Sequence, residues 1–180
     1  MFLSSQILST PRLLLRPHTM EDAEAIAKVV KASMPELSRY MPWAHARYSA
    51  EDARLFIGRA MVMRENEAGY EFLILDANTG VILGGCGLNR FDHENKTCNL
   101  GYWVRTNRTR QGVATEAARL LIKFGFEELK LNRIEIIAEV TNIASQRVAE
   151  KAGGVREGVM RKRLLLHGEG RDAVLFGVVR

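Results

Sequence analysis

The chain has 180 residues, 47% of them hydrophobic and 26% charged, which suits a single globular domain over residues 1–180. It contains no internal repeat, linker or low-complexity tract. The net charge of +5 favours an anionic cofactor or an acidic partner, although a solvated basic surface explains it equally well. No block of lysines and arginines is dense enough to predict direct nucleic-acid binding.

The cysteines, the histidines and the apolar runs indicate where the protein is expected in the cell and whether it is expected to bind a metal. The two cysteines, Cys86 and Cys98, exclude a disulfide framework, and as free thiols they fit a reducing compartment. The first residues lack the pattern of a signal peptide, and no apolar run approaches about 18 residues, so we expect a cytoplasmic protein without a membrane segment. The histidines show no metal-ligand spacing, and no metal is expected.

Helical periodicity dominates the first third of the chain. A short strand at residues 12–16 precedes a helix at 19–32, and a second long helix occupies 49–67; each begins with a capping pattern. Between them, residues 33–45 suit a loop or a short helix. Two aromatic residues of this segment line either a substrate cleft or a small core cluster, with equal support: Tyr40 and Trp43.

Alternating apolar and polar residues then predict three antiparallel strands, at residues 70–75, 81–88 and 97–104. Turns at 78–80 and within 92–96 join them. Three glycines in the second of these strands predict a bulge or a close backbone contact there: Gly84, Gly85 and Gly87.

The last third of the chain alternates helix and strand. We predict a helix after Gly112, a strand at 133–140, a shorter helix at 142–152 and a hairpin at 155–179 that turns at 167–170. A strand–helix–strand unit of this length implies a parallel strand pair with a right-handed crossover. The fold class is therefore α/β, with a mixed, mostly antiparallel sheet flanked by helices.

The most informative stretch runs from Tyr102 to Ala118: a strand, a polar loop, and a helix whose first turn we expect at 110–114. The first N–H groups of a helix have no partner within it, and the helix dipole adds partial positive charge there. Gly112 lets a bulky anion approach these groups, and Arg108 and Arg110 supply full charges beside it. The pattern predicts a diphosphate cradle, although a plain loop-to-helix turn with solvated arginines fits this stretch equally well.

This stretch resembles the acetyl-coenzyme A motif Q/R-x-x-G-x-G/A of the GNAT N-acetyltransferases. Gly112 and Ala114 match its small positions, and the T-E-A that follows is similar to the RimJ/RimL branch, whereas Thr109 departs from the motif's first residue. The predicted order of elements is also that of the GNAT fold, in which the parallel strand pair forms the coenzyme cleft. The resemblance implies acetyl-CoA as co-substrate and these cofactor-binding residues: Trp103, Val104, Arg110, Gln111, Gly112, Val113, Ala114, Thr115, Asn142 and Ser145.

A second pattern follows the strand at 133–140. Taken alone, Asn142 and Ser145 favour an ordinary helix cap. They also resemble the N-x-x-S segment of the RimJ/RimL branch, in which the Asn binds the pantetheine arm of the coenzyme and the Ser faces its sulfur.

In that family the amine attacks the thioester directly, so the resemblance implies three catalytic tasks. Ser145 is the candidate donor to the departing thiolate, because the helix at 142–152 has no Tyr. A backbone N–H near 102–104 is the expected oxyanion donor. Glu139 is the candidate base, although a structural salt bridge explains this carboxylate equally well.

The acceptor is constrained by the pKa of its amine. An α-amine has a pKa near 8 and a lysine about 10.4, so only the former has a sizeable neutral fraction at pH 7, and the lack of an obvious strong base favours it. The branch implies ribosomal-protein N-termini, including an acidic stalk protein with an N-terminal serine, acetylated by a monomer or homodimer. A polyamine, aminoglycoside or amino acid is the alternative acceptor, and a non-catalytic acyl-CoA sensor is a third possibility. The expected substrate-binding residues are Tyr40, Trp43 and Tyr102.

Overall fold

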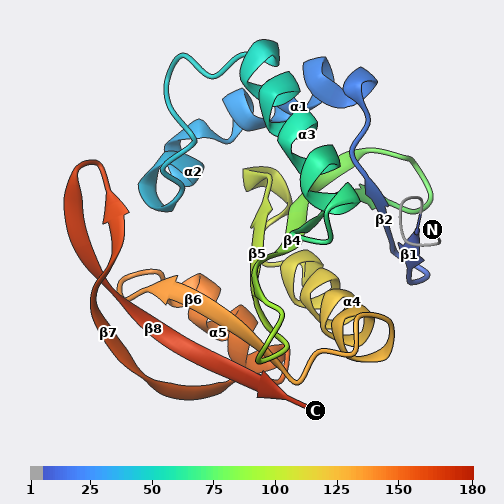
Figure 1. The fold of residues 1–180 in the computed structure, drawn as a ribbon. Helices are drawn as coiled ribbons and strands as arrows, with labels where there is room; N and C mark the ends of the chain where they lie inside the picture. The colour runs from blue at the N-terminus through green and yellow to red at the C-terminus, as the bar shows by residue number, and fades with distance from the viewer. Residues whose placement is uncertain (1–5) are drawn as a thin grey trace.

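An eight-stranded sheet runs through residues 6–180, which are the residues that the computed structural model describes (Figure 1). The strands lie in the order β1-β2-β3-β4-β5-β6-β8-β7, and β5–β6 is the parallel pair among antiparallel neighbours. The predicted α/β class with a mixed sheet is confirmed. The strands are β1 Leu8–Ser9, β2 Leu13–Pro17, β3 Tyr70–Asp76, β4 Ile82–Asp92, β5 Thr97–Val104, β6 Arg133–Glu139, β7 Val155–Leu166 and β8 Glu169–Val179.

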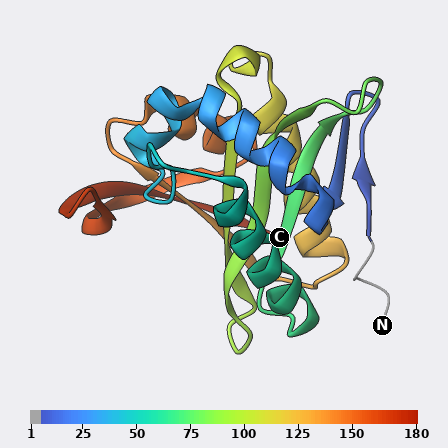
Figure 2. The same cartoon turned by 90° about the horizontal axis from the view of Figure 1, so that it is seen from above.

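Helices cover both faces of this sheet. They are α1 Ala23–Ala32, α2 Met34–Tyr40, α3 Ala50–Glu65, α4 Val113–Glu127 and α5 Ile143–Lys151, with short 3-10 turns at Met20–Asp22 and Thr106–Arg108. Figures 1 and 2 show α1, α2 and α3 gathered on one side and α4 and α5 on the other. Because side chains alternate along each strand, the strands β2 to β5 contribute to both layers.

Two hydrophobic cores result from this alternation. The larger core lies between the sheet and α4, around Phe72, Leu100 and Leu121. The smaller core lies between the sheet and the helices α1 to α3, around Leu73 and Ile57. Residues 72 and 73 are neighbours in β3 and point into different cores, as the two-residue period of a strand requires.

The predicted helix starts are confirmed by their caps. The Thr19 N–H donates to Asp22 Oδ2 over 2.8 Å, and the Ser49 N–H donates to Asp52 Oδ2 over 2.8 Å. In each case a carboxylate one turn inside the helix satisfies a backbone donor at its entrance. Residues 33–45 contain the short helix α2, one of the two forms that we predicted.

The parallel pair β5–β6 separates after a short paired segment. Thr97 to Asn99 of β5 pair with Arg133 to Glu135 of β6, and within the described residues the pairing stops there. Beyond this point β5 is paired on its other side with β4, and β6 with β8. The backbone groups of β5 that point towards β6 are therefore left without a strand partner from Leu100 to Val104, as the predicted cofactor cleft requires.

The C-terminal hairpin β7–β8 extends from the sheet towards α2 (Figure 1). Its tip is a two-residue turn, with positive φ at His167 and Gly168, so the predicted four-residue turn at 167–170 is shorter than expected. The His167 Nε2 atom lies 2.8 Å from the Ser38 carbonyl oxygen of α2. The hairpin tip and α2 thus meet on the side of the sheet that carries the smaller core.

Three further findings concern the sequence expectations. The two-residue strand β1 was not predicted. The helix α4 begins at Val113, directly after Gly112 as predicted, whereas residues 110–112, which we expected in its first turn, precede the helix. The expected irregularity in β4 is confirmed, because its pairing with β3 shifts between Ile74 and Leu75. Cys86 and Cys98 are both buried and free. None of the helices in residues 6–180 is long and apolar enough to span a bilayer.

Candidate functional site

The start of α4 lies at the end of β5, beside the mouth of the separated strands. Gly112 caps the helix with φ +80°, a left-handed conformation that a side chain would strain. The first helical hydrogen bond runs from the Glu116 N–H to the Gly112 carbonyl, so the N–H groups of residues 113–115 have no partner within the helix. A Cβ added to Gly112 would meet nothing within 4 Å, so the space beside the helix cap is open to an anion.

The loop before Gly112 increases this capacity. Arg110 also has a positive φ, of 61°, so left-handed residues flank Gln111, and such alternation turns successive N–H groups into an anion-binding concavity. Arg108 and Arg110 are exposed on the same loop. The loop thus offers a helix end with two cations beside it, and its use as a diphosphate cradle stays a prediction.

An ion pair to the first strands fixes the orientation of this helix end. Arg12 donates to the Gln111 carbonyl oxygen over 2.9 Å and pairs with Glu116 at 3.4 Å, while the Thr10 hydroxyl contacts the same carboxylate. The Glu116 side chain is only 24% exposed. This contact could not be predicted from the sequence, because Arg12 and Glu116 lie far apart in the chain.

Ser145 lies across the cleft mouth from β5, on the first turn of α5. Asn142 caps this helix, and its Oδ1 atom accepts from the Ser145 N–H at 3.1 Å. The Tyr102 hydroxyl of β5 donates to the Ser145 carbonyl oxygen at 2.9 Å and lies 3.1 Å from Ser145 Oγ. Burial raises the pKa of Tyr102 to about 12, against a smaller lowering by the bond to Ser145, so this hydroxyl is neutral at physiological pH.

Glu139 is 6% exposed, and its contacts are local. Its Oε2 atom accepts from the Thr141 N–H at 2.7 Å and from the Thr141 hydroxyl at 2.6 Å. These bonds shape the loop that leads from β6 into α5. The arrangement favours a structural role for this carboxylate, and its role as a base stays a prediction.

An aromatic group lies on the opposite face of β5 from Tyr102. The Trp43 ring is 5.9 Å from that of Trp103 and 5.8 Å from that of Tyr48, and Trp43 is 39% exposed. The Tyr40 hydroxyl lies 3.5 Å from the Thr141 carbonyl oxygen. Tyr40 therefore lies beside the β6–α5 loop and Trp43 beside the end of β5, whereas Tyr102 faces α5.

The remaining predicted cofactor-binding residues lie at the end of β5 and the start of α4. Trp103 faces the smaller core and Val104 the larger one, at the end of β5. Val113 is buried beneath the helix start, and Ala114 and Thr115 are half-buried on its first turn. The structure thus places the predicted cofactor residues on two segments, the β5–α4 junction and the start of α5, beside the place where the β5–β6 pairing stops.

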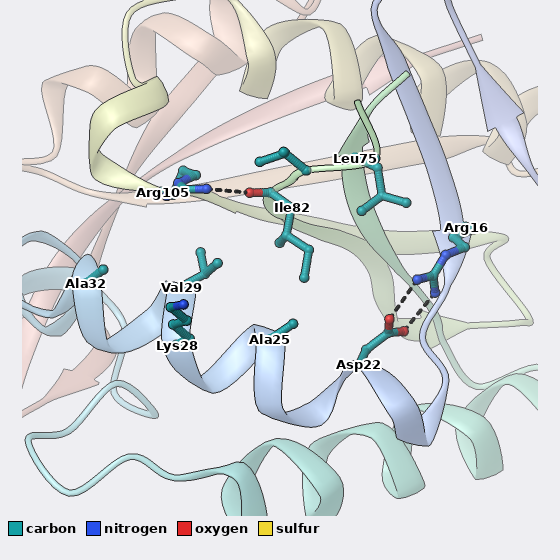
Figure 3. A pocket seen from close by; sticks show the side chains of 11 residues that line it. Arg16, Asp22, Ala25, Lys28, Val29, Ala32, Leu75, Ile82 and Arg105 are labelled. Atoms are coloured by element: carbon teal, nitrogen blue, oxygen red, sulfur yellow. Dashed lines mark hydrogen bonds and ion pairs between the residues drawn. The ribbon is translucent and has the colours of Figure 1, made fainter. Parts of the chain in front are cut away.

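A separate open pocket of about 540 Å³ lies between α1 and the β3–β4 turn (Figure 3). Arg16 and Asp22 form a two-bond ion pair at one end, and Arg105 donates to the Ile82 carbonyl oxygen at the other. None of the predicted site residues lines this pocket. Among residues 6–180, no group of three His, Cys, Asp or Glu side chains is arranged to hold a metal ion.

Comparisons with known proteins agree with this geometry. Residues 12–155 match the family described as "Acetyltransferase (GNAT) domain". The chain is 33% identical over 165 residues to the putative ribosomal N-acetyltransferase YdaF of Bacillus subtilis, covering 89% of this chain and 87% of that protein.

Two solved structures superpose over nearly the whole chain. One is a putative ribosomal-protein-serine acetyltransferase from Vibrio cholerae, with a TM-score of 0.86, 30% identity and coverage of 97% and 98% of the two chains. The other is the microcin C7 self-immunity acetyltransferase MccE in complex with acetyl-CoA and AMP, with a TM-score of 0.89, 26% identity and coverage of 95% and 94%. The chain belongs to the GNAT family and is an acetyl-CoA-dependent N-acetyltransferase.

Proposed function

We propose that this enzyme acetylates the N-terminal α-amine of a protein, and that the acceptor is a ribosomal protein. The observation that carries the site assignment is the open end of α4 at Gly112, beside strands β5 and β6 that separate after Asn99. A diphosphate held at this helix end directs the rest of acetyl-CoA along the separated strands. Its thioester then lies between β5 and the start of α5.

The site residues divide the chemistry into three tasks. The backbone N–H groups of residues 113–115 bind the diphosphate, with Arg110 beside them. An unpaired N–H of β5 between Leu100 and Val104 stabilises the oxyanion that forms when the amine attacks the carbonyl carbon. The Ser145 hydroxyl donates to the sulfur as the carbon–sulfur bond breaks.

The acceptor class is supported by charge, pKa and relatives. An α-amine with a pKa near 8 is about one-tenth neutral at pH 7, whereas a lysine is almost entirely charged. The net charge of +5 suits an acidic protein such as a ribosomal stalk protein. YdaF is named as a putative ribosomal N-acetyltransferase and the Vibrio cholerae protein as a putative ribosomal-protein-serine acetyltransferase. The two free thiols suit the cytoplasm, where ribosomal proteins are made.

Acetylation of a panel of acceptors by the purified enzyme tests this function. We expect mass spectrometry to detect transfer to peptides with a free N-terminal serine or alanine, and little transfer to polyamines, aminoglycosides or free amino acids. A preference for small amines would replace the proposed acceptor with the small-molecule alternative.

A substitution at Gly112 tests the cradle independently of the acceptor. Gly112→Val places a β-branched residue at φ +80° and should weaken acetyl-CoA binding at least tenfold by calorimetry. Gly168→Val is the matched control, because it makes the same change at φ +81° in the hairpin tip. Equal affinities for both variants would remove the cradle from the mechanism.

A further inference from the structure

A polar row crosses the sheet beneath the closed end of the cleft. The Asn99 Nδ2 of β5 donates to Asn89 Oδ1 of β4 at 2.9 Å, and Asn89 Nδ2 donates to Glu71 Oε1 of β3 at 3.1 Å. Asn99 is also the last β5 residue paired with β6. The row therefore connects the point where the strands separate to a half-buried carboxylate two strands away.

Glycines bring the Glu71 carboxylate close to the cleft. Glu71 pairs with Gly87, and Gly87 pairs with Gly101 on β5. A Cβ on Gly87 would clash with Glu71 Oε2, so the carboxylate lies over this glycine. One strand spacing, roughly 4.8 Å, then separates the carboxylate from Gly101.

The surface above Gly101 is open. A Cβ placed there would meet only the Asn89 amide nitrogen, at 4.0 Å. Trp103 follows on the same face of β5, and its indole covers Gly85. An amine above Gly101 would thus lie between an aromatic ring and a carboxylate, two groups that attract an ammonium ion.

Gly101 is also where the reacting carbonyl is expected under the proposed function. A coenzyme bound by its diphosphate at Gly112 extends back along β5 from its C-terminal end towards the closed end at Asn99. Gly101 is two residues from Asn99, so the coenzyme reaches it before the closed end. It lies on the face of β5 opposite to Tyr102 and α5.

We propose that Glu71 is the base of the reaction and accepts the proton of the acceptor amine across Gly101. This inference rests on the proposed function. The acceptor arrives as an ammonium ion and gives one proton to the Glu71 carboxylate. The neutral nitrogen attacks the carbonyl carbon, a carbon–nitrogen bond forms and the carbon–sulfur bond breaks. The nitrogen's second proton neutralises the thiolate, and Glu71 releases its proton to solvent.

The environment of Glu71 favours binding of a proton by its carboxylate. Burial raises the pKa of its carboxyl, against opposing effects of the Asn89 hydrogen bond and the charge of Arg64 on α3. Cys86 of β4 is the other titratable neighbour, and burial together with Glu71 raises the pKa of its thiol, so it stays protonated. Glu71 thus has a higher affinity for a proton than an ordinary surface carboxylate.

The test compares the same substitution at three carboxylates: Glu71→Gln, Glu135→Gln and Glu139→Gln. Glu135 of β6 lies opposite Asn99 in the parallel strand pair. Its carboxylate forms an ion pair with Arg133 at 3.0 Å. We expect Glu71→Gln to lower kcat/KM for the acceptor about 100-fold at pH 7. Acetyl-CoA affinity, measured by calorimetry, should stay unchanged.

The pH dependence separates a base from a structural group. Without a base the enzyme needs an amine that is already neutral, and the neutral fraction of an α-amine rises about tenfold between pH 7 and 9.5. The Glu71→Gln deficit should therefore shrink about tenfold over this range. A deficit that is constant with pH, or one that follows Glu135→Gln or Glu139→Gln instead, would overturn the assignment.

The proposed acceptor can be wrong while Glu71 is still the base. If the wild-type enzyme acetylates only small amines, the three variants are compared with that amine, and a pH-dependent loss at Glu71 still supports the base. If the wild-type enzyme transfers acetyl to no amine at all, both proposals fall.

Discussion

At the scale of single residues, the Tyr102 hydroxyl has one proton and two acceptors on Ser145, the carbonyl oxygen and Oγ. When Tyr102 donates to the carbonyl oxygen, its own oxygen can accept the Ser145 hydroxyl proton. When Tyr102 donates to Oγ instead, the Ser145 proton is free to point at sulfur. Rotation of two hydroxyls thus supplies the thiolate donor without ionising a tyrosine whose pKa is about 12.

This arrangement predicts the acidity of bound coenzyme A. Ser145→Ala removes a hydrogen bond to a charged sulfur, worth about 1.5–3 kcal/mol, and should raise the pKa of the bound thiol by at least about one unit. Tyr102→Phe should raise it by less, and kcat should fall in both variants. Ultraviolet absorbance of the thiolate in a pH titration measures the shift. Tyr70→Phe, on β3, is the control, and an unshifted thiol pKa in Ser145→Ala would exclude the hydroxyl as the donor.

At the scale of elements, the start of α5 has two possible tasks, because Asn142 caps the helix and is also predicted to bind the coenzyme. Asn142→Ser keeps a favoured cap but loses the amide, so the free energy of unfolding should change by only a few tenths of a kcal/mol while acetyl-CoA binds more weakly. Asn142→Ala removes both the cap and the amide, so it should weaken acetyl-CoA binding and also lower the free energy of unfolding by about 1 kcal/mol. Chemical denaturation and calorimetry measure the two effects. If Asn142→Ser binds acetyl-CoA as tightly as the wild type, the amide is only a cap.

The sequence predicted those helices and strands that depend on local signals, namely the periodicity of apolar residues and helix caps. The strand at 97–104 and the caps at Thr19 and Ser49 follow from neighbouring residues, and the structure has them where expected. The strand β1 has two residues, too few for a period to show. Arg110 precedes α4 rather than lying in its first turn, because the positive φ of Arg110 is not encoded by its residue type.

The site was less accessible than the fold, because it depends on register between strands. The cradle could be located from Gly112 and its flanking arginines. The row from Asn99 through Asn89 to Glu71 could not, because the three residues are separated in sequence and meet only through the pairing of β3, β4 and β5. A hairpin register read from the turn at 78–80 would place Glu71 opposite Gly87 only if the bulge near Leu75 were known.

At the scale of the whole molecule, the sheet lies between two hydrophobic cores, and its strands β5 and β6 separate after a short paired segment. The larger core binds α4 to the sheet, and the smaller core binds α1 to α3. Their junction at the N-terminal side is the segment from β2 to α1, where Arg16 pairs with Asp22 and His18 is buried against Phe56. Stability of the whole fold should therefore respond to the charge state of this segment.

His18 predicts how unfolding depends on pH. It is 7% exposed, its buried Nδ1 atom lacks a hydrogen-bond partner, and burial lowers its pKa from 6.5 to about 4, with the charge of Asp22 opposing. Because the unfolded state binds the proton more readily, the free energy of unfolding should fall as the pH drops from about 6.5 to 4. The full effect is about 3 kcal/mol. The pKa of Asp22 is also lowered, so its contribution is lost only at a still lower pH.

Urea denaturation at several pH values measures this dependence. His18→Gln cannot ionise, so its stability should change little between pH 6.5 and 4.5, even if it starts below the wild type. His93→Gln, which removes an exposed histidine, should keep the wild-type slope. If His18→Gln loses stability on acidification as steeply as the wild-type protein does, the buried imidazole is not the group that couples folding to protons, and the coupling must come from carboxylates elsewhere in the fold.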